Sequence, residues 1–177
     1  VRYTVHPSRL VQGCVTGRDC IPAIDDPEFV PADEATDLDP DARVVGLDVD
    51  GEARAYPLSI LRGHEIVNDD IAGRPVAVTY CPLCRSGLVF SRRVDGQRLD
   101  FGVSGKLLDA NLVMYDRQTG TYWSQLRARA IVGDLVPETL EQVPSTLTTW
   151  GDWRQGHPDS LVLDGSGLGR GRDPYLS

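Results

Sequence analysis

The amino-acid sequence predicts an α+β fold that is mainly antiparallel β, arranged as a curled sheet or a partly open barrel of hairpins with a few short helices. Three turn signals carry this prediction: Asp-Gly at 50–51, Asp-Gly at 95–96 and Thr-Gly at 119–120. Each dipeptide is flanked on both sides by β-branched, apolar or aromatic residues, as in a β-hairpin. Successive hairpins pair antiparallel, and a sheet that closes or curls covers its edge strands.

Residues 1–43 have little periodic apolar pattern and are rich in Pro, Asp and Gly. This composition predicts an N-terminal arm or loop, with one helical turn at residues 32–35. Cys14 and Cys20 stand in a polar, Gly-containing part of the arm, where two nearby thiols can reach disulfide distance. We therefore expect a Cys14–Cys20 disulfide that staples the arm locally.

Residues 44–164 are predicted to form a β-rich core domain, so that the chain is a single domain overall. The segment "RPVAVTYC", residues 74–81, is a short apolar run with β-branched members, and it predicts a well-buried strand. Residues 165–177 have the Gly-rich, polar composition of a flexible C-terminal tail.

Two short helices are expected within the core. Pro57 suits the first position of a helix and Gly63 suits its end, so His64 would lie just beyond that end. Thr149 suits the N-cap of a second helix over residues 150–155, because its hydroxyl can accept a hydrogen bond from a free backbone N–H of the first turn.

Composition limits the partners and the location. The net charge of −8 and the sequence pI of about 4.8 argue against nucleic-acid binding, which needs a concentrated surplus of Lys and Arg. No run of about 18 apolar residues is present, so no transmembrane segment is expected. The chain opens on Val1 and not on Met, so a removed leader would leave no trace, and the location has to be argued from the cysteines. A persistent disulfide requires an oxidising compartment. We therefore expect an extracytoplasmic protein, secreted or membrane-anchored.

The motif "YCPLC" places Cys81 and Cys84 two residues apart, directly after the predicted buried strand. Pro82 restricts the intervening turn, so both sulfurs can point the same way. This arrangement serves soft-metal ligation, a reversible dithiol–disulfide couple, or a structural disulfide. The functional interpretation depends on which of the three applies.

The first hypothesis is a soft-metal protein that uses Cys81, Cys84 and His64 as ligands in copper handling or copper-dependent redox chemistry. Two thiolates and an imidazole suit copper(I) best and zinc second. Glu65 could orient the His64 ring, and the thioether of Met114 could contribute, although its place in an apolar β-run is more typical of the core.

The second hypothesis is a thiol–disulfide oxidoreductase acting on a small-molecule or thiol substrate, in which Cys81 attacks and Cys84 resolves. A strand-like segment follows the pair, whereas thioredoxin-like proteins place a helix there whose dipole lowers the thiol pKa. The third hypothesis is a non-catalytic β-domain in which both cysteine pairs are structural disulfides.

Six motifs follow one another over about residues 21–163: "DGEARAYPLSIL", "HEIVND", "PVAVTYCPLCRSG", "FGVSGKL", "NLVMYDRQTGTYWSQ" and "TTWGDW". In this order they resemble the bacterial family known as domain of unknown function 3179. The resemblance implies export or lipid anchoring, which is often predicted for family members, and assigns no activity. In the family's pattern a Gly or small residue usually follows the second cysteine, where this chain has Arg85, and the Cys14–Cys20 pair is additional.

Other residues in the matching motifs are candidates for a surrounding pocket. Lys106 could act as an electrostatic group, and the Trp123 indole could exclude water from a thiolate site or belong to the core. We expect Asp116 and Arg117 to form a structural ion pair at a turn, where carboxylates commonly bond nearby groups.

Overall fold

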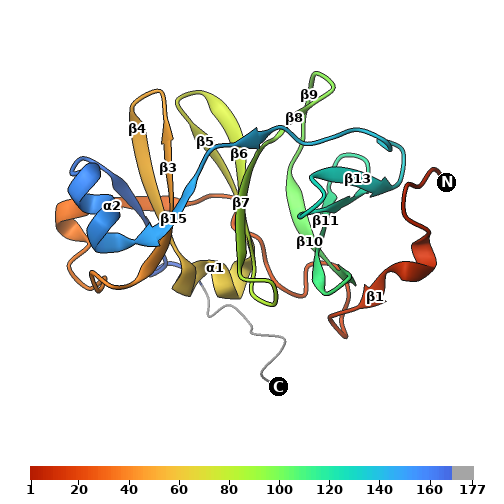
Figure 1. Ribbon diagram of the computed structural model, residues 1–177, viewed down its shortest axis with the longest axis horizontal. Coiled ribbons are helices and arrows are strands. Elements are labelled where there is room, and N and C mark those ends of the chain that lie inside the picture. Colours follow the sequence, from red (N-terminus) through yellow and green to blue (C-terminus); the bar gives the residue numbers. More distant parts are fainter. Residues whose placement is uncertain (169–177) are drawn as a thin grey trace.

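Three open β-sheets and two short α-helices make up residues 1–168, the part of the chain that the computed structural model describes (Figure 1). The named strands pair antiparallel except for β16 with β4, which confirms the predicted α+β, mainly antiparallel fold. Across sheet A the order is β1 (Val11–Gln12), β10 (Phe101–Leu108), β11 (Asn111–Asp116), β12 (Tyr122–Ser124) and β13 (Arg129–Val132).

The other strands belong to sheets B and C and to one small hairpin. Sheet B has the order β14 (Gln142–Val143), β7 (Ser86–Ser91), β6 (Arg74–Cys81) and β5 (Ile66–Ile71). Sheet C has the order β15 (Thr146–Thr149), β3 (Arg43–Val49), β4 (Glu52–Pro57), β16 (Leu161–Asp164) and β2 (Glu28–Pro31). The hairpin pairs β8 (Arg93–Val94) with β9 (Gln97–Arg98). The helices are α1 (Leu58–His64) and α2 (Trp150–Gly156), with 3₁₀ turns at Pro7–Arg9 and Ala32–Glu34.

Sheet B is the central layer, with sheet A against one face and sheet C against the other (Figure 1). Side chains of β6 alternate between the two interfaces: Ala77 and Cys81 pack toward sheet A, while Val78 and Tyr80 pack toward sheet C. A strand covered on both faces needs apolar residues at successive positions, which explains the run Pro75-Val76-Ala77-Val78 in this strand, where every residue from 75 to 81 is buried. The prediction of a well-buried strand there is confirmed.

Two of the three predicted hairpins form as expected, at 50–51 between β3 and β4 and at 119–120 between β11 and β12. The third, at 95–96, closes only two residue pairs. Its longer arms diverge, because β7 continues sheet B while β10 belongs to sheet A. The predicted hairpin is therefore present but short, and the segments that flank it form the crossing between two layers.

Both predicted helices are present, with one difference at the end of α1. Pro57 closes β4, and the helix runs through Gly63 to His64, so His64 is the last helical residue. Glu65 ends the helix by adopting a φ of 64° and donating its N–H to the Leu61 carbonyl, the role that the sequence suggested for Gly63.

Helix α2 begins as predicted after Thr149, whose hydroxyl accepts a hydrogen bond from the N–H of Asp152. It packs on sheet C through Trp150 and Trp153. Gly46 on β3 is required for this contact, because a Cβ at that position would overlap the Trp153 ring.

The arm and the tail both contact the sheets. Strand β1 pairs with β10, β2 pairs with β16, and Cys14 and Cys20 form a disulfide with sulfurs 2.15 Å apart. Of the predicted flexible tail, residues 169–177 lie outside the described residues, while Leu168 packs against the core between sheets B and C. Within residues 1–168 no helix is both long and apolar enough to cross a membrane.

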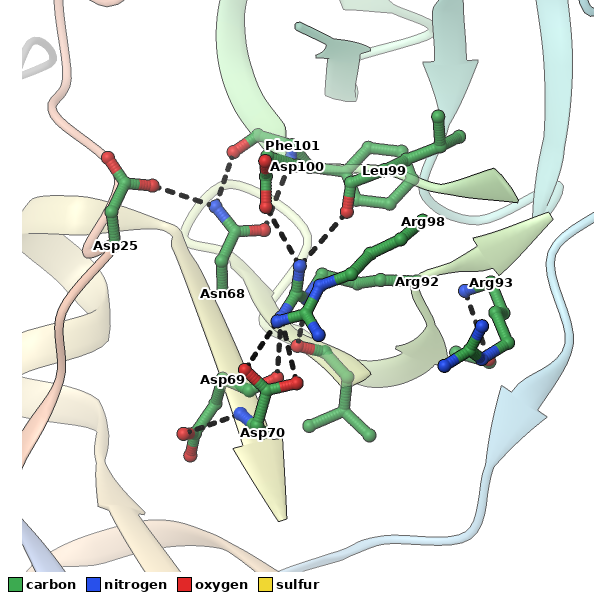
Figure 2. Close-up of polar contacts among 12 residues, drawn as sticks. Asp25, Asn68, Asp69, Asp70, Arg92, Arg93, Arg98, Leu99, Asp100 and Phe101 are labelled. Carbon is green, nitrogen blue, oxygen red and sulfur yellow. Dashed lines mark hydrogen bonds and ion pairs between the residues drawn. The ribbon is translucent and has the colours of Figure 1, made fainter. Parts of the chain in front are cut away.

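A buried arginine holds sheet B to the segment that enters sheet A (Figure 2). Arg92 is 2% exposed, and its Nε donates to the Val76 carbonyl at 2.9 Å. Its two Nη atoms donate to the carbonyls of Leu99 (3.1 Å) and Asp69 (2.8 Å) and to the Asp100 carboxylate (2.8 Å). The guanidinium thus replaces backbone partners at a place where strand pairing breaks off.

Asn68 makes a second polar link between the two layers (Figure 2). From β5 of sheet B, its side chain accepts from the Phe101 N–H at 3.0 Å and donates to the Phe101 carbonyl at 2.8 Å. The amide therefore imitates a paired strand residue against β10 of sheet A. Its Nδ2 also donates to Asp25, which follows the Ile24 bridge to β5.

Replacing Arg92 by leucine is expected to lower the free energy of unfolding by about 3–5 kcal/mol, because three buried carbonyls and a carboxylate lose their donor. The matched change Arg93→Leu, at the exposed neighbour, should cost less than about 0.5 kcal/mol. Urea unfolding monitored by tryptophan fluorescence measures both. Equal effects at the two positions would contradict a structural role specific to Arg92.

Candidate functional site

The two core cysteines lie side by side at the end of β6. Cys81 is its last residue and is 1% exposed, while Cys84 is half-buried in the turn that follows. Both are free thiols, and their sulfurs are 3.2 Å apart. Strand β7 begins two residues after Cys84, which confirms that no helix follows the pair.

The turn of residues 82–85 sets this geometry. It joins Cys81 to Ser86, which pair across the antiparallel ladder of β6 and β7. Arg85 closes the turn in the left-handed region, with a φ of 53°. Because the ladder holds both ends of the turn, the Cys84 sulfur is kept over the end of β6.

Cys81 and Cys84 have different environments. The Cys81 thiol packs in the core between sheets A and B, and burial raises its pKa from 9.0 to about 11. The Cys84 thiol lies within hydrogen-bond distance of the Ala110 carbonyl, at 3.2 Å. Cys81 therefore holds its proton at neutral pH, and Cys84 is the sulfur that solvent can reach.

A buried network of uncharged polar side chains lies against Cys84. Gln125 is fully buried, and its Nε2 donates to Thr79 Oγ1 at 2.9 Å. Its Oε1 accepts from Ser86 Oγ and from Asn111 Nδ2, each at 2.9 Å. Asn111 Nδ2 also reaches the Cys84 sulfur at 3.4 Å. Sheets A and B thus jointly position a donor beside the exposed thiol.

The sequence interpretation missed these amides. Asn111 and Gln125 lie in the motif "NLVMYDRQTGTYWSQ", where they flank apolar strands, and amide side chains at such positions usually face solvent. Both side chains are buried here because they bond to backbone as well: Leu126 N–H donates to Asn111 Oδ1, and Gln125 Nε2 donates to the Ser86 carbonyl. The sequence signal that could have identified them is a pair of amide residues, one before and one after two consecutive buried strands.

His64 is placed differently from the two thiols. Its ring is buried and donates from Nδ1 to the Pro22 carbonyl at 2.7 Å, which fixes the end of α1 to the arm. Within residues 1–168 no three His, Cys, Asp or Glu side chains are arranged to hold a metal ion. The structure therefore brings Cys81 and Cys84 together without His64, and the copper or zinc site stays a prediction.

Met114 and Trp123 face each other across β11 and β12 in the core that also contains Cys81. Both side chains are fully buried. Asp116 is buried as well, and its carboxylate accepts from the Trp123 indole N–H at 2.9 Å and from the backbone of Thr119 at 2.6 Å. These three predicted residues therefore hold the β11–β12 hairpin closed.

The expected ion pair between Asp116 and Arg117 is wrong. Arg117 pairs with Asp25 at 2.7 Å instead. Adjacent residues at a strand end point to opposite sides, so Asp116 turns into the core while Arg117 reaches the arm.

Glu65 and Lys106 come together near the other cysteine pair. They line a small cavity of about 10 Å³ together with Cys14 and Cys20. Neither core cysteine contributes to the described lining of that cavity. The structure thus groups these two charged residues with the disulfide of the arm.

The raised pKa of Cys81 predicts how stability depends on pH. Below about pH 9 the thiol is protonated in both folded and unfolded chains; between about pH 9 and 11 the unfolded chain loses its proton first. The free energy of unfolding should therefore fall by about 2–3 kcal/mol more over this range than in Cys81→Ala. Urea unfolding of both proteins under one reductant concentration tests this, and parallel pH profiles would contradict it.

Comparison with known proteins places the chain in a family. No curated protein and no solved structure gives a significant match. The family model described as "Protein of unknown function (DUF3179)" matches residues 18–177, which include Cys81, Cys84, Asn111 and Gln125 but not Cys14. The resemblance inferred from the motifs is therefore confirmed, and the chain belongs to this family of proteins of unknown function.

Proposed function

We propose that the protein carries out thiol–disulfide exchange, with Cys81 and Cys84 cycling between a dithiol and a disulfide. The observation that carries this proposal is the separation of 3.2 Å between two free sulfurs in one turn. A disulfide bond is about 2.05 Å long, so closure needs an approach of only about 1 Å. The substrate class is a disulfide or dithiol that can reach the exposed sulfur.

The exposure of the two sulfurs assigns their roles. Cys84 is the attacking thiol because it is half-buried, whereas Cys81 is enclosed by the core and resolves the intermediate. This order reverses the sequence-based expectation that Cys81 attacks. The reason is steric, since a substrate sulfur must approach its nucleophile in line.

The chemistry is a balanced exchange of electrons and protons. The Cys84 thiolate attacks one sulfur of the substrate disulfide, which forms a mixed disulfide and releases the first substrate thiol. Cys81 then loses its proton and attacks the Cys84 sulfur, which forms the Cys81–Cys84 bond and releases the second substrate thiol. The protein dithiol is oxidised by two electrons as the substrate disulfide is reduced, and the reverse sequence oxidises a substrate dithiol.

The polar network supports this cycle. As a thiol, Cys84 donates to the Ala110 carbonyl; as a thiolate, it retains the Asn111 Nδ2 donor. Gln125 holds the Asn111 amide in place through the 2.9 Å bond to its Oε1. The donor is therefore oriented before reaction begins.

The alternative proposal is a metal site at Cys81 and Cys84 that binds copper(I), with zinc as the second choice of metal. What supports it is that two free, adjacent sulfurs form the soft ligand set that copper(I) prefers. With Nδ1 of His64 engaged by Pro22, Nε2 is the nitrogen left for a metal. We also propose an extracytoplasmic location, supported by the Cys14–Cys20 disulfide.

Trapping with glutathione disulfide tests the exchange proposal. In Cys81→Ser the exposed Cys84 should form a stable mixed disulfide, detected by mass spectrometry, and Cys84→Ser should react at least about tenfold more slowly because its remaining thiol is buried and protonated. The wild type should instead pass to an internal disulfide. A double variant, Cys14→Ala with Cys20→Ala, serves as the control that keeps this behaviour.

Two results would overturn the proposal: faster trapping in Cys84→Ser than in Cys81→Ser, or a wild type that never forms the internal bond. A parallel titration with copper(I) under a competing chelator separates the alternative. Chelator-resistant copper binding that is lost in Cys84→Ser, with no internal disulfide formed, would favour the metal site.

A further inference from the structure

A cleft of about 760 Å³ opens beside the turn that carries the thiols. It lies on the sheet C side of β6, because Tyr80 lines it and packs in the core between sheets B and C. Cys81, the next residue, faces sheet A. The cleft and the thiol pair therefore occupy opposite faces of one strand end. Its lining residues are Arg43, Leu58, Arg62, Tyr80, Pro82, Arg85 and Leu147.

Three arginines from three separate elements converge on this cleft. Arg43 begins β3, Arg62 lies in the last turn of α1, and Arg85 closes the turn after Cys84. Helix α1 contacts β3 and β6 and lies near the end of sheet B at which the chain turns from β6 into β7 (Figure 1). These three arginines are about 20 positions apart along the chain, and the fold brings their positive charges together at the cleft.

None of these three guanidiniums has an ion pair or hydrogen-bond partner within residues 1–168. Other arginines of the described chain, such as Arg54 and Arg117, pair with carboxylates at 2.8 Å and 2.7 Å. The chain as a whole has a net charge of −8, so acidic side chains are abundant. A local cluster of unneutralised cations in an acidic protein produces a positive potential that attracts anions.

The backbone at Arg85 adopts a conformation that disfavours a side chain, as it does at eight other described non-glycine residues. Its φ of 53° lies in the left-handed region, where a side chain costs conformational energy that glycine avoids. Stability alone would therefore favour glycine at this position.

We propose that the cleft binds a small organic anion, a carboxylate or a phosphate ester on an apolar body. Guanidinium groups match the two oxygens of such anions with paired N–H donors. Leu58, Pro82 and Leu147 supply apolar wall for the ligand body, and the cleft has the volume of a small-molecule site. This inference does not depend on the exchange chemistry at the thiols.

Titration of the reduced full chain with phenyl phosphate and, in parallel, benzoate tests the proposal. Amide chemical shifts in ¹H–¹⁵N spectra at low salt should change at the cleft residues, and benzyl alcohol, which lacks the charge, should produce no comparable change. Whichever of the two anions binds with the lower Kd identifies whether the natural ligand is a phosphate or a carboxylate. Arg62→Gln and Arg43→Gln should each weaken binding by about tenfold or more, as loss of a charge-assisted hydrogen bond does.

Two further variants distinguish a loss of ligand binding from the effect of net charge and from the effect of a change in stability. Arg154→Gln removes the same charge from an exposed position on α2 and should leave binding unchanged. Arg85→Gly should weaken binding similarly while raising the thermal midpoint, because glycine relieves the left-handed strain. The proposal is overturned if neither anion shifts the cleft residues, or if Arg154→Gln weakens binding as much as Arg62→Gln.

Discussion

Sheets A and B are joined by buried polar side chains that bond to backbone where the strand ladders stop. Arg92 supplies donors to carbonyls on both sides of the crossing into β10, and Asn68 pairs with the main chain of Phe101. Apolar packing alone is tolerant of small shifts between layers, whereas these bonds accept only one register. The geometry around Cys84 needs that precision, because its neighbour Asn111 comes from the opposite sheet.

The central position of sheet B explains why one turn serves two different environments. Successive residues of a strand face opposite sides, so Tyr80 enters the interface with sheet C while Cys81 enters the interface with sheet A. The turn that follows continues this division. Cys84 lies within hydrogen-bond distance of the Asn111 amide, and Arg85 lines the cleft on the sheet C side of β6. Neither environment would exist if one face of β6 were open to solvent.

Local signals were sufficient for much of the fold and for half of the candidate site. The Asp-Gly turn at 50–51, the Thr149 cap and the apolar run into Cys81 are each specified by neighbours in the chain. What could not be predicted depends on contacts between distant segments: Gln125 meets Thr79 across 46 positions, which no spacing rule encodes. The short length of the 95–96 hairpin has the same cause, since the strands on either side of it pair in two different sheets.

The burial of Cys81 constrains any chemistry at this turn. A thiolate enclosed by the core lacks solvation, which raises the pKa of Cys81 and keeps its sulfur protonated. A covalent bond at this sulfur avoids the cost of a buried negative charge. The proposed disulfide to Cys84 meets that condition, and the bonds of Gln125 to Thr79 and Ser86 involve neither sulfur. Because Arg85 belongs to the same turn, a ligand held in the cleft and a bond formed between the sulfurs act on adjacent residues, and any influence of one on the other must be reciprocal.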